Sequence, residues 1–309
     1  MTAPQVEVLL QTVLSGLLLG GLYALIGIGM TLIMGVMKII NLAHGELMMV
    51  GMYIAYVLFS AFHIDPYLSI LVAAPALFLL GVLIQKFLIN PVMKVDAIIP
   101  ENQVILTVGI GMVLANIATI IFSSDYKTTP VDYATKAWYL SDIWKASPIE
   151  LSLSLPWSVS FCFALMITAA LWFFLTKTDM GKSIRATAQD KDAALLMGVN
   201  VEKMRVVTFG LGSALVGSAG CLFIPIYYLY PDLGGQFTLT AFVITILGGL
   251  GSTVGAIVGG LILGVFESLT STYAGMGWAP VGRFVIFLAA LIFVPQGIMS
   301  LFTRKRFGK

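Results

Sequence analysis

The amino-acid sequence predicts an all-α membrane protein, a polytopic transmembrane helix bundle of about eight hydrophobic segments. Of its 309 residues, 59% are hydrophobic and only 10% are charged, whereas a soluble domain carries about 25% charged residues. The apolar residues form continuous runs, and a helix needs roughly 20 such residues to cross a bilayer. These runs lack the alternation that is typical of membrane β-barrels, so we expect helices throughout.

The predicted spans follow one another along a single transmembrane domain, residues 1–309. Seven long apolar runs each predict one membrane helix: residues 8–34, 40–61, 67–89, 103–122, 157–176, 206–230 and 282–302. Two glycine-rich runs, 238–250 and 254–273, lie between the last two of these. Because the run 238–250 is too short to span comfortably, we expect a broken or re-entrant pair. Such a pair is tolerated only where it is buried in protein or lines a cavity.

The distribution of basic residues predicts the orientation of the chain. Lys and Arg concentrate in the loop 177–205 and in the tail after residue 303. Short cytoplasmic loops are enriched in these residues, so both segments are predicted to be cytoplasmic. In the long loop 123–156 acidic residues offset the lysines, and we expect this loop outside. Counting spans from these segments places the N-terminus outside and the C-terminus in the cytoplasm.

Glycines recur at four-residue intervals in two of the predicted helices. Gly16 and Gly20 have this spacing, and so do Gly251, Gly255 and Gly259. Small residues at this interval let two helix backbones approach closely within a membrane. We therefore expect both sets at helix–helix contacts.

The cytoplasmic loop 177–205 contains a predicted short helix with an apolar body. Asp190 is a plausible N-cap, and Gly198 suits the position just after the helix end. The body between them includes Ala193, Ala194 and Leu195. Such a helix could dock into a groove on a partner protein. It could equally lie on the lipid surface, and the residues alone do not decide between the two.

Polar residues interrupt the apolar sequence at "KIINLAHGELMMVG", residues 38–51. Asn41 and His44 are three apart and would share one helix face, whereas Glu46 would point elsewhere. Asn41 could simply be the N-cap of the second span. Alternatively, the trio forms a polar break that lines a translocation route at a helix end.

Two ionisable residues stand near the last spans. Glu267 lies inside the second glycine-rich run, and such a group usually faces a pathway or a partner. It could instead be a carboxyl group near the outer interface. Arg283 lies close to the predicted outer boundary, and we expect its side chain to snorkel toward the interface.

Several other function classes find no support in the sequence. The stretch "GKS" at 181–183 resembles the end of a phosphate-binding loop, but Thr176 stands where the first glycine belongs and a membrane helix precedes it. "GGLGSTVG" at 248–255 has a spacing one residue too long for a dinucleotide site. The two histidines and two cysteines form no metal-ligand or catalytic pattern. We therefore expect no nucleotide, metal or catalytic site on this chain.

Four stretches share the pattern of one family: "GLYALIGIGMTLIMGVMKIINLAHGELMMVG" (21–51), "TDMGKSIRATAQDKDAALLMGVNVEKMRVVTFGLGSALVGSAGCL" (178–222), "FVITILGGLGSTVGAIVGGLILGVFESL" (242–269) and "FVPQGIMSLF" (293–302). In this order, they resemble the permease subunits of high-affinity branched-chain amino acid ABC transporters. The resemblance covers nearly the whole chain and is weakest in the loop 123–156. It implies a multi-pass permease of the bacterial inner membrane that imports branched-chain or other hydrophobic amino acids.

The resemblance also implies partners and site residues. A second related permease, forming a heterodimer rather than a homodimer, two cytosolic ATPases and a periplasmic solute-binding protein would complete the importer. The importer would contact the lipid bilayer and no nucleic acid. ATP would bind the ATPases, leaving this chain without a cofactor. The resemblance makes 177–205 the coupling loop, seated on an ATPase through Arg185, Asp190, Asp192, Ala193, Ala194, Leu195 and Gly198. The substrate pathway would include Asn41, His44, Glu46 and Glu267.

Two alternatives to this function stay open. Relatives with the same family pattern import urea or short amides, and no residue of the sequence decides the solute. The chain could also be a secondary transporter that works alone and uses Glu46 or Glu267 as a proton site. An autonomous transporter does not need the large charged loop 177–205, so the sequence favours the ABC permease.

Overall fold

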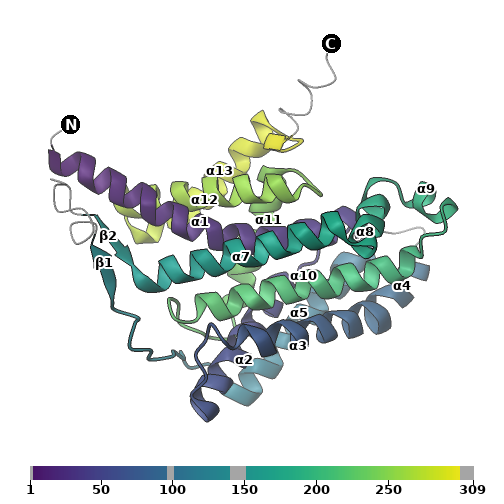
Figure 1. Ribbon diagram of the computed structural model, residues 1–309, viewed down its shortest axis with the longest axis horizontal. Helices are drawn as coiled ribbons and strands as arrows, with labels where there is room; N and C mark the ends of the chain where they lie inside the picture. Colours follow the sequence, from purple (N-terminus) through teal and green to yellow (C-terminus); the bar gives the residue numbers. More distant parts are fainter. Residues whose placement is uncertain (1–2, 96–100, 140–150, 300–309) are drawn as a thin grey trace.

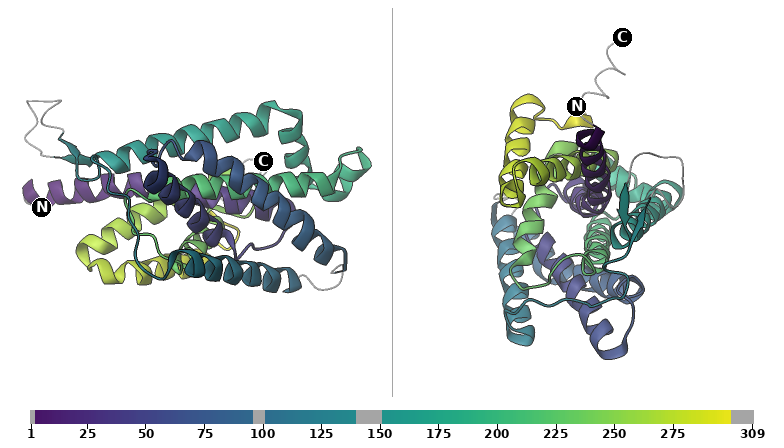
Figure 2. Two further views of the ribbon diagram at one scale, coloured as in Figure 1. Left: turned by 90° about the horizontal axis from the view of Figure 1, so that it is seen from below. Right: turned by 90° about the vertical axis from the view of Figure 1, so that its left-hand side faces the viewer.

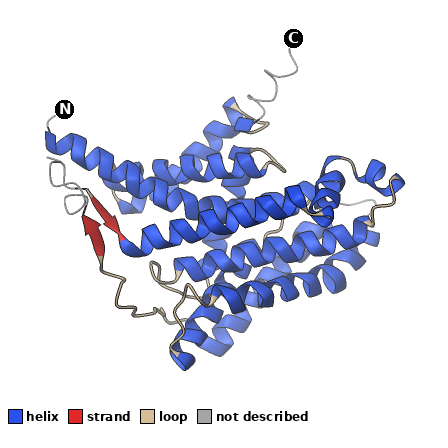
Figure 3. Ribbon diagram, in the orientation of Figure 1, coloured by secondary structure: helices blue, strands red, loops and turns tan. Residues whose placement is uncertain are grey.

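The computed structural model describes residues 3–95, 101–139 and 151–299, and these residues are mostly helical (Figures 1 and 3). The elements are, in chain order, α1 (Ala3–Met37), α2 (His44–Phe62), α3 (Ile70–Ile84), the π-helix η1 (Gln85–Ile89), α4 (Asn90–Val95), α5 (Glu101–Phe122), β1 (Ala137–Tyr139), β2 (Ser152–Ser154), α7 (Leu155–Lys177), α8 (Asp179–Gln189), α9 (Lys191–Leu196), α10 (Val201–Phe223), α11 (Leu233–Gly248), α12 (Thr253–Tyr273), the 3-10 helix η2 (Met276–Trp278) and α13 (Ala279–Phe293). Among the described residues, eight helices are long and apolar enough to cross a membrane. The predicted polytopic helix bundle is therefore confirmed.

The two ends of the bundle carry different elements. Strands β1 and β2 pair antiparallel at one end, which we call the strand end. The short helices α8 and α9 lie at the opposite end, which we call the loop end (Figure 1). Helix α1 runs along the middle and contacts α12, α10, α11 and α7 (Figure 2). From Leu19 to Met37 every residue of α1 is buried, so this helix forms the core of the bundle.

Helix α10 begins and ends earlier than the expected run 206–230. The side-chain oxygen of Asn200 accepts a hydrogen bond from the Lys203 N–H, so the helix starts at Val201. It ends at Phe223, and the chain then turns toward α11.

Helix α13 also differs from the expected run 282–302. It begins at Ala279 and ends at Phe293, because Pro295 lacks a backbone N–H to continue the helix. Gly297, with a φ of 80°, then bends the chain away. The basic residues of the C-terminal tail lie outside the described residues.

The glycines of α1 allow it to touch α12 backbone to backbone. A Cβ atom at Gly16 would lie 2.6 Å from the Val265 Cα, and one at Gly20 would lie 2.7 Å from the Leu261 Cα. Real side chains do not pack this closely. The predicted close contact at Gly16 and Gly20 is therefore confirmed.

Helix α12 presents a second row of glycines to α11. A Cβ at Gly255 would collide with the Gly248 carbonyl, and one at Gly259 would lie 2.8 Å from the Ile244 carbonyl oxygen. Gly251 instead lies beside Gly35, near the end of α1. The three predicted glycines thus sit at two different helix contacts.

The two glycine-rich helices have unequal lengths. Helix α12 has 21 residues and reaches spanning length, whereas α11 has 16 and does not. Gly249 and Gly251 take positive φ angles of 102° and 80° in the turn between them, a conformation that favours glycine. A re-entrant path for the pair stays a prediction.

Candidate functional site

The chain folds back into the bundle between α1 and α2. Helix α1 ends at Met37, and Lys38 takes a positive φ of 60°. Helix α2 then starts at His44, which reaches the carbonyl oxygen of Ile26 at 3.1 Å. Ile26 precedes the end of α1 by 37 − 26 = 11 residues, or about 16 Å of helix rise. The first turn of α2 therefore starts deep inside the protein.

Asn41 lies in this returning segment, outside any helix, so it does not share a helix face with His44 as expected. Its Oδ1 accepts a hydrogen bond from the Ala43 N–H at 3.1 Å, and no side chain caps α2. The simple N-cap interpretation of Asn41 is therefore wrong in detail. The side chain instead holds the turn that delivers the chain to α2, and it is fully buried.

His44 is also fully buried. Because a carbonyl oxygen can only accept, the contact with Ile26 requires the proton on Nε2. Neither the His44 Nδ1 nor the Asn41 Nδ2 has a hydrogen-bond partner within the described chain. Buried polar atoms normally find partners in the protein or in bound water. These two atoms are therefore the polar groups of the break that have no hydrogen-bond partner among the described residues.

Glu46 occupies a separate environment in the first turn of α2. Its Oε2 lies 3.2 Å from the hydroxyl of Thr238 on α11, and that hydroxyl also accepts the Gly45 N–H at 2.8 Å. A Cβ at Gly234 would lie 2.8 Å from the Glu46 Cα, and one at Gly111 would lie 3.3 Å from its Cδ. Glycines on two neighbouring helices thus make the space that this carboxyl group fills.

Glu267 faces the interior from α12 and is 8% exposed. Its Oε2 accepts a hydrogen bond from the Tyr23 hydroxyl at 3.0 Å and lies 3.5 Å from the Arg283 Nε. The Arg283 Nη1 donates to the Thr240 hydroxyl at 2.7 Å. The expectation that Arg283 snorkels is therefore wrong. Its guanidinium turns inward because a buried carboxylate and a hydroxyl on neighbouring helices receive it.

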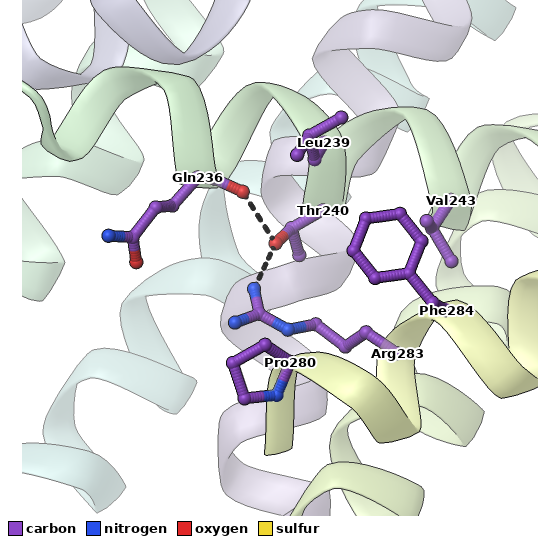
Figure 4. A pocket seen from close by; sticks show the side chains of 7 residues that line it. All are labelled: Gln236, Leu239, Thr240, Val243, Pro280, Arg283 and Phe284. Atoms are coloured by element: carbon purple, nitrogen blue, oxygen red, sulfur yellow. Dashed lines mark hydrogen bonds between the residues drawn. The ribbon is translucent and has the colours of Figure 1, made fainter. Parts of the chain in front are cut away.

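Three cavities surround this ion pair. One of about 180 Å³ is lined by both Glu267 and Arg283 together with several tyrosines. A second, of about 290 Å³, lies between α11 and α13 and shares Gln236 and Arg283 with the first (Figure 4). A third, of about 330 Å³, has Glu267 in its wall. The ion pair is thus the polar point between adjoining cavities.

Helix α11 connects the two carboxyl groups. Gly234, in its first turn, packs on Glu46, while Gln236 and Phe237 line the cavity that holds Glu267. The walls of the three cavities include neither Asn41 nor His44. The structure therefore brings Glu46 and Glu267 to one short helix and leaves Asn41 and His44 in a separate, tightly packed position.

The loop helix α9 forms as the sequence predicts. The Asp190 side chain accepts hydrogen bonds from the Asp192 and Ala193 N–H groups, both at 2.9 Å. Gly198 follows the helix with a φ of 81°. The apolar Leu196 is 88% exposed, so the helix presents an uncovered hydrophobic tip. Other predicted coupling residues are also exposed: Arg185, Asp192, Ala193 and Leu195.

Ala194 differs from its neighbours because it is only 4% exposed. Its backbone carbonyl oxygen accepts the Val199 N–H at 3.0 Å, a bond that closes the turn after α9. The loop is tied to the bundle farther along, where the Asn90 amide donates to Glu202 at 3.3 Å. Ala194 therefore holds the shape of the loop, and Leu195, Leu196 and Met197 form its exposed surface.

Sequence reasoning missed the partners of both carboxyl groups. These partners are Thr238 beside Glu46, and Tyr23 and Thr240 beside the ion pair. In the sequence they look like ordinary residues of apolar helices. One signal was available: Arg283 and Glu267 are opposite charges in consecutive apolar helices, and intramembrane charges usually pair.

The described residues contain eight helices of spanning length and an ion pair buried between adjoining cavities. Buried charges in such a helical bundle are typical of membrane transport permeases. Among the described residues no cluster of His, Cys, Asp and Glu could hold a metal ion. Comparison with known proteins gives the family. The chain belongs to the family described as branched-chain amino acid transport system / permease component, whose pattern matches residues 12–295.

Curated relatives match over nearly the full chain. The high-affinity branched-chain amino acid transport system permease protein LivH of Salmonella typhimurium is 31% identical, over 94% of this chain and 95% of its own. The corresponding protein BraD of Pseudomonas aeruginosa is 29% identical, over 96% and 97%. A probable LivH protein of Methanocaldococcus jannaschii is 30% identical, over 92% and 90%. This family is one of transport permeases and not of enzymes.

Proposed function

We propose that the chain is a membrane-spanning permease of an ABC importer for branched-chain or other hydrophobic amino acids. The observation that carries this proposal is the family match over residues 12–295. The relatives LivH and BraD are branched-chain amino acid permeases, and this supports the solute. Residues 1–309 act as one permease domain without a nucleotide site of its own.

The importer contains further chains. A second related permease pairs with this one, preferably as a heterodimer, and two cytosolic ATPases bind at the loop end. A periplasmic binding protein delivers the solute at the strand end. The orientation follows the basic residues of the loop 177–205, which place the loop end in the cytoplasm and the N-terminus outside.

The ATPase contact is the exposed tip of α9. Leu195, Leu196 and Met197 are 60%, 88% and 83% exposed, and a groove on the ATPase buries them. Asp190 and Gly198 fix the helix ends, and Asn90 links the loop to the span α3–α4. Movement of the ATPases therefore reaches the bundle through a short, capped helix and not through a flexible loop.

The solute passes beside the polar groups in the bundle. Glu46 and Glu267, on either side of α11, are the ionisable contacts. The neutral contacts are the Asn41 Nδ2 and the His44 Nδ1, which have no partner among the described residues. Apolar walls between them suit a solute with a hydrophobic side chain. Alternating access follows when the ATPases bind two states of the permease with different affinity.

Reconstituted uptake tests the proposal. The chain is placed in proteoliposomes with its cognate second permease, ATPases and binding protein, and radiolabelled leucine uptake is measured with ATP or a non-hydrolysable analogue. We expect uptake with ATP alone. Leucine uptake by this chain without the other subunits, driven by a proton gradient, would instead show a stand-alone transporter. ATP-driven uptake of urea but not leucine would identify the urea or amide importer.

A further inference from the structure

The Glu267–Arg283 pair is joined loosely. Its single contact, between the Arg283 Nε and the Glu267 Oε2, measures 3.5 Å, whereas charge-assisted hydrogen bonds are about 2.7–2.9 Å. Each group makes its shorter contact with a neutral hydroxyl. Glu267 accepts a hydrogen bond from the Tyr23 hydroxyl, and Arg283 donates one to the Thr240 hydroxyl. Each charge therefore keeps capacity for a second, charged partner.

Both charges can be reached from the same cavity. The side chains of Glu267 and Arg283 are 11% and 18% exposed, and both line the cavity of about 180 Å³. Tyrosine rings form much of its wall: Tyr23, Tyr126, Tyr227, Tyr228 and Tyr230. Aromatic faces attract cations, so the wall favours an ammonium group beside the carboxylate.

The neighbouring cavity has a different lining beyond Arg283. Leu239, Val243 and Phe284 form its apolar side, and the guanidinium lies toward Thr240 and Gln236 (Figure 4). Its volume of about 290 Å³ is near the lower limit for a small-molecule site. A positive group thus stands in the wall of a pocket suited to a branched aliphatic side chain.

We propose that this place binds the solute itself, as an α-amino acid with a branched apolar side chain. Arg283 takes the carboxylate, Glu267 takes the ammonium group, and the side chain enters the pocket formed by Leu239, Val243 and Phe284. This proposal rests on the proposed function and names the contact points of the solute. Arg283 sets specificity for the carboxylate, and Glu267 for the ammonium group.

The charges of the pair explain why a zwitterion suits the site. An isolated charge is expensive to bury, but a paired one is far less so. The pair is neutral before binding, and adding a zwitterion of opposed polarity leaves the site neutral. A solute with only one charge would give this buried site a net charge, which is expensive. The site therefore selects for both charges together.

Binding to the full-length chain in lipid nanodiscs tests this proposal. Radiolabelled leucine is displaced by unlabelled leucine, by isopentylamine, which lacks the carboxylate, or by 4-methylpentanoate, which lacks the ammonium group. In the wild type we expect leucine to compete at least about ten-fold better than either analogue, because each loses a charge-assisted contact.

Two variants separate the roles of the charges. Arg283→Gln should abolish the preference for leucine over isopentylamine while keeping part of the preference over 4-methylpentanoate. Glu267→Gln should do the reverse. A merely structural ion pair could lower thermal stability in both variants, but it would leave these two preferences unchanged. Unchanged preferences in both variants would overturn the proposal.

A third variant tests the apolar pocket. Leu239→Phe narrows it and should weaken leucine binding at least about ten-fold, as one charge contact does, while alanine binding changes little. Leu288→Phe, on the exposed face of α13 outside the pocket wall, is the matched control and should leave both unchanged. Equal effects of the two substitutions on leucine would count against the pocket.

Failure of this proposal is distinguishable from failure of the proposed function. ATP-driven leucine uptake by the reconstituted importer, together with no saturable leucine binding at this chain, would overturn the site and leave the importer intact. Saturable binding that both charge variants alter as expected, without ATP-driven uptake, would keep the site and refute the importer.

Discussion

Adding one methyl group at Gly20 should force α1 and α12 apart. A Cβ there would lie 2.7 Å from the Leu261 Cα and 3.0 Å from the Gly260 carbonyl oxygen. Carbon atoms pack at about 3.5–4.0 Å, so the helices must separate by roughly 1 Å. Both obstacles are backbone atoms and cannot rotate away. Overpacking of this kind costs about 1–3 kcal/mol.

The matched control is the same substitution at Gly109. This glycine lies in α5, is exposed, and would place its Cβ with nothing within 4 Å. Replacing glycine by alanine inside a helix gains up to about 1 kcal/mol from backbone propensity. That gain is common to both variants, so the difference in unfolding free energy between Gly20→Ala and Gly109→Ala measures the packing cost alone.

Denaturant unfolding in detergent, followed by tryptophan fluorescence, provides the comparison. We expect Gly20→Ala to be about 1–3 kcal/mol less stable than Gly109→Ala, and Gly109→Ala to be at least as stable as wild type. Equal stability of the two variants would refute the backbone contact between α1 and α12.

Three further predictions concern the loop end, the strand end and the polar break. Leu196→Asp should leave the stability of the loop unchanged, because the side chain is exposed, but it should uncouple ATP hydrolysis from transport. Ala194→Asp should instead destabilise the loop, because it would bury a charge. Coupled ATP hydrolysis in Leu196→Asp would contradict the docking site. Tyr133→Phe removes a 2.8 Å hydrogen bond to Asp65 and should cost about 1 kcal/mol. Burial, with the Asp65 contact second, raises the Tyr133 pKa well above its ordinary value, so the bond stabilises fully below about pH 10 and less as pH rises; a gap to wild type that widens above pH 10 would be inconsistent. His44→Leu should lower leucine uptake while the protein still assembles, and loss of assembly would assign His44 a structural role.

Local sequence patterns predicted much of the fold. The cap at Asp190 and the glycine after α9 depend on a few adjacent residues, and both formed as expected. The end of the last span was predicted nine residues too late, because the apolar run continues past Pro295. A proline does not interrupt an apolar run, but it does interrupt the backbone hydrogen bonds of a helix.

The candidate site was predicted only in part. Glu46 and Glu267 stand out in sequence as charges in apolar helices, but their partners Thr238 and Tyr23 do not. Arg283 was assigned to the interface because it lies near a helix end. The direction in which the Arg283 side chain points depends on how α12 and α13 are rotated relative to each other. No local sequence pattern predicts that rotation.

The sequence by itself determined that this chain is a helical membrane bundle whose basic loop 177–205 contains a capped helix. In a membrane, the backbone of a continuous apolar run can form hydrogen bonds only with itself, so the helices follow from local composition. Only the tertiary structure decided that α2 starts deep beside Ile26, that α12 meets α1 at Gly16 and Gly20 and α11 at Gly255 and Gly259, and that Arg283 meets Glu267. Each of these depends on which faces of distant helices come together, and that choice is made by packing of the whole bundle.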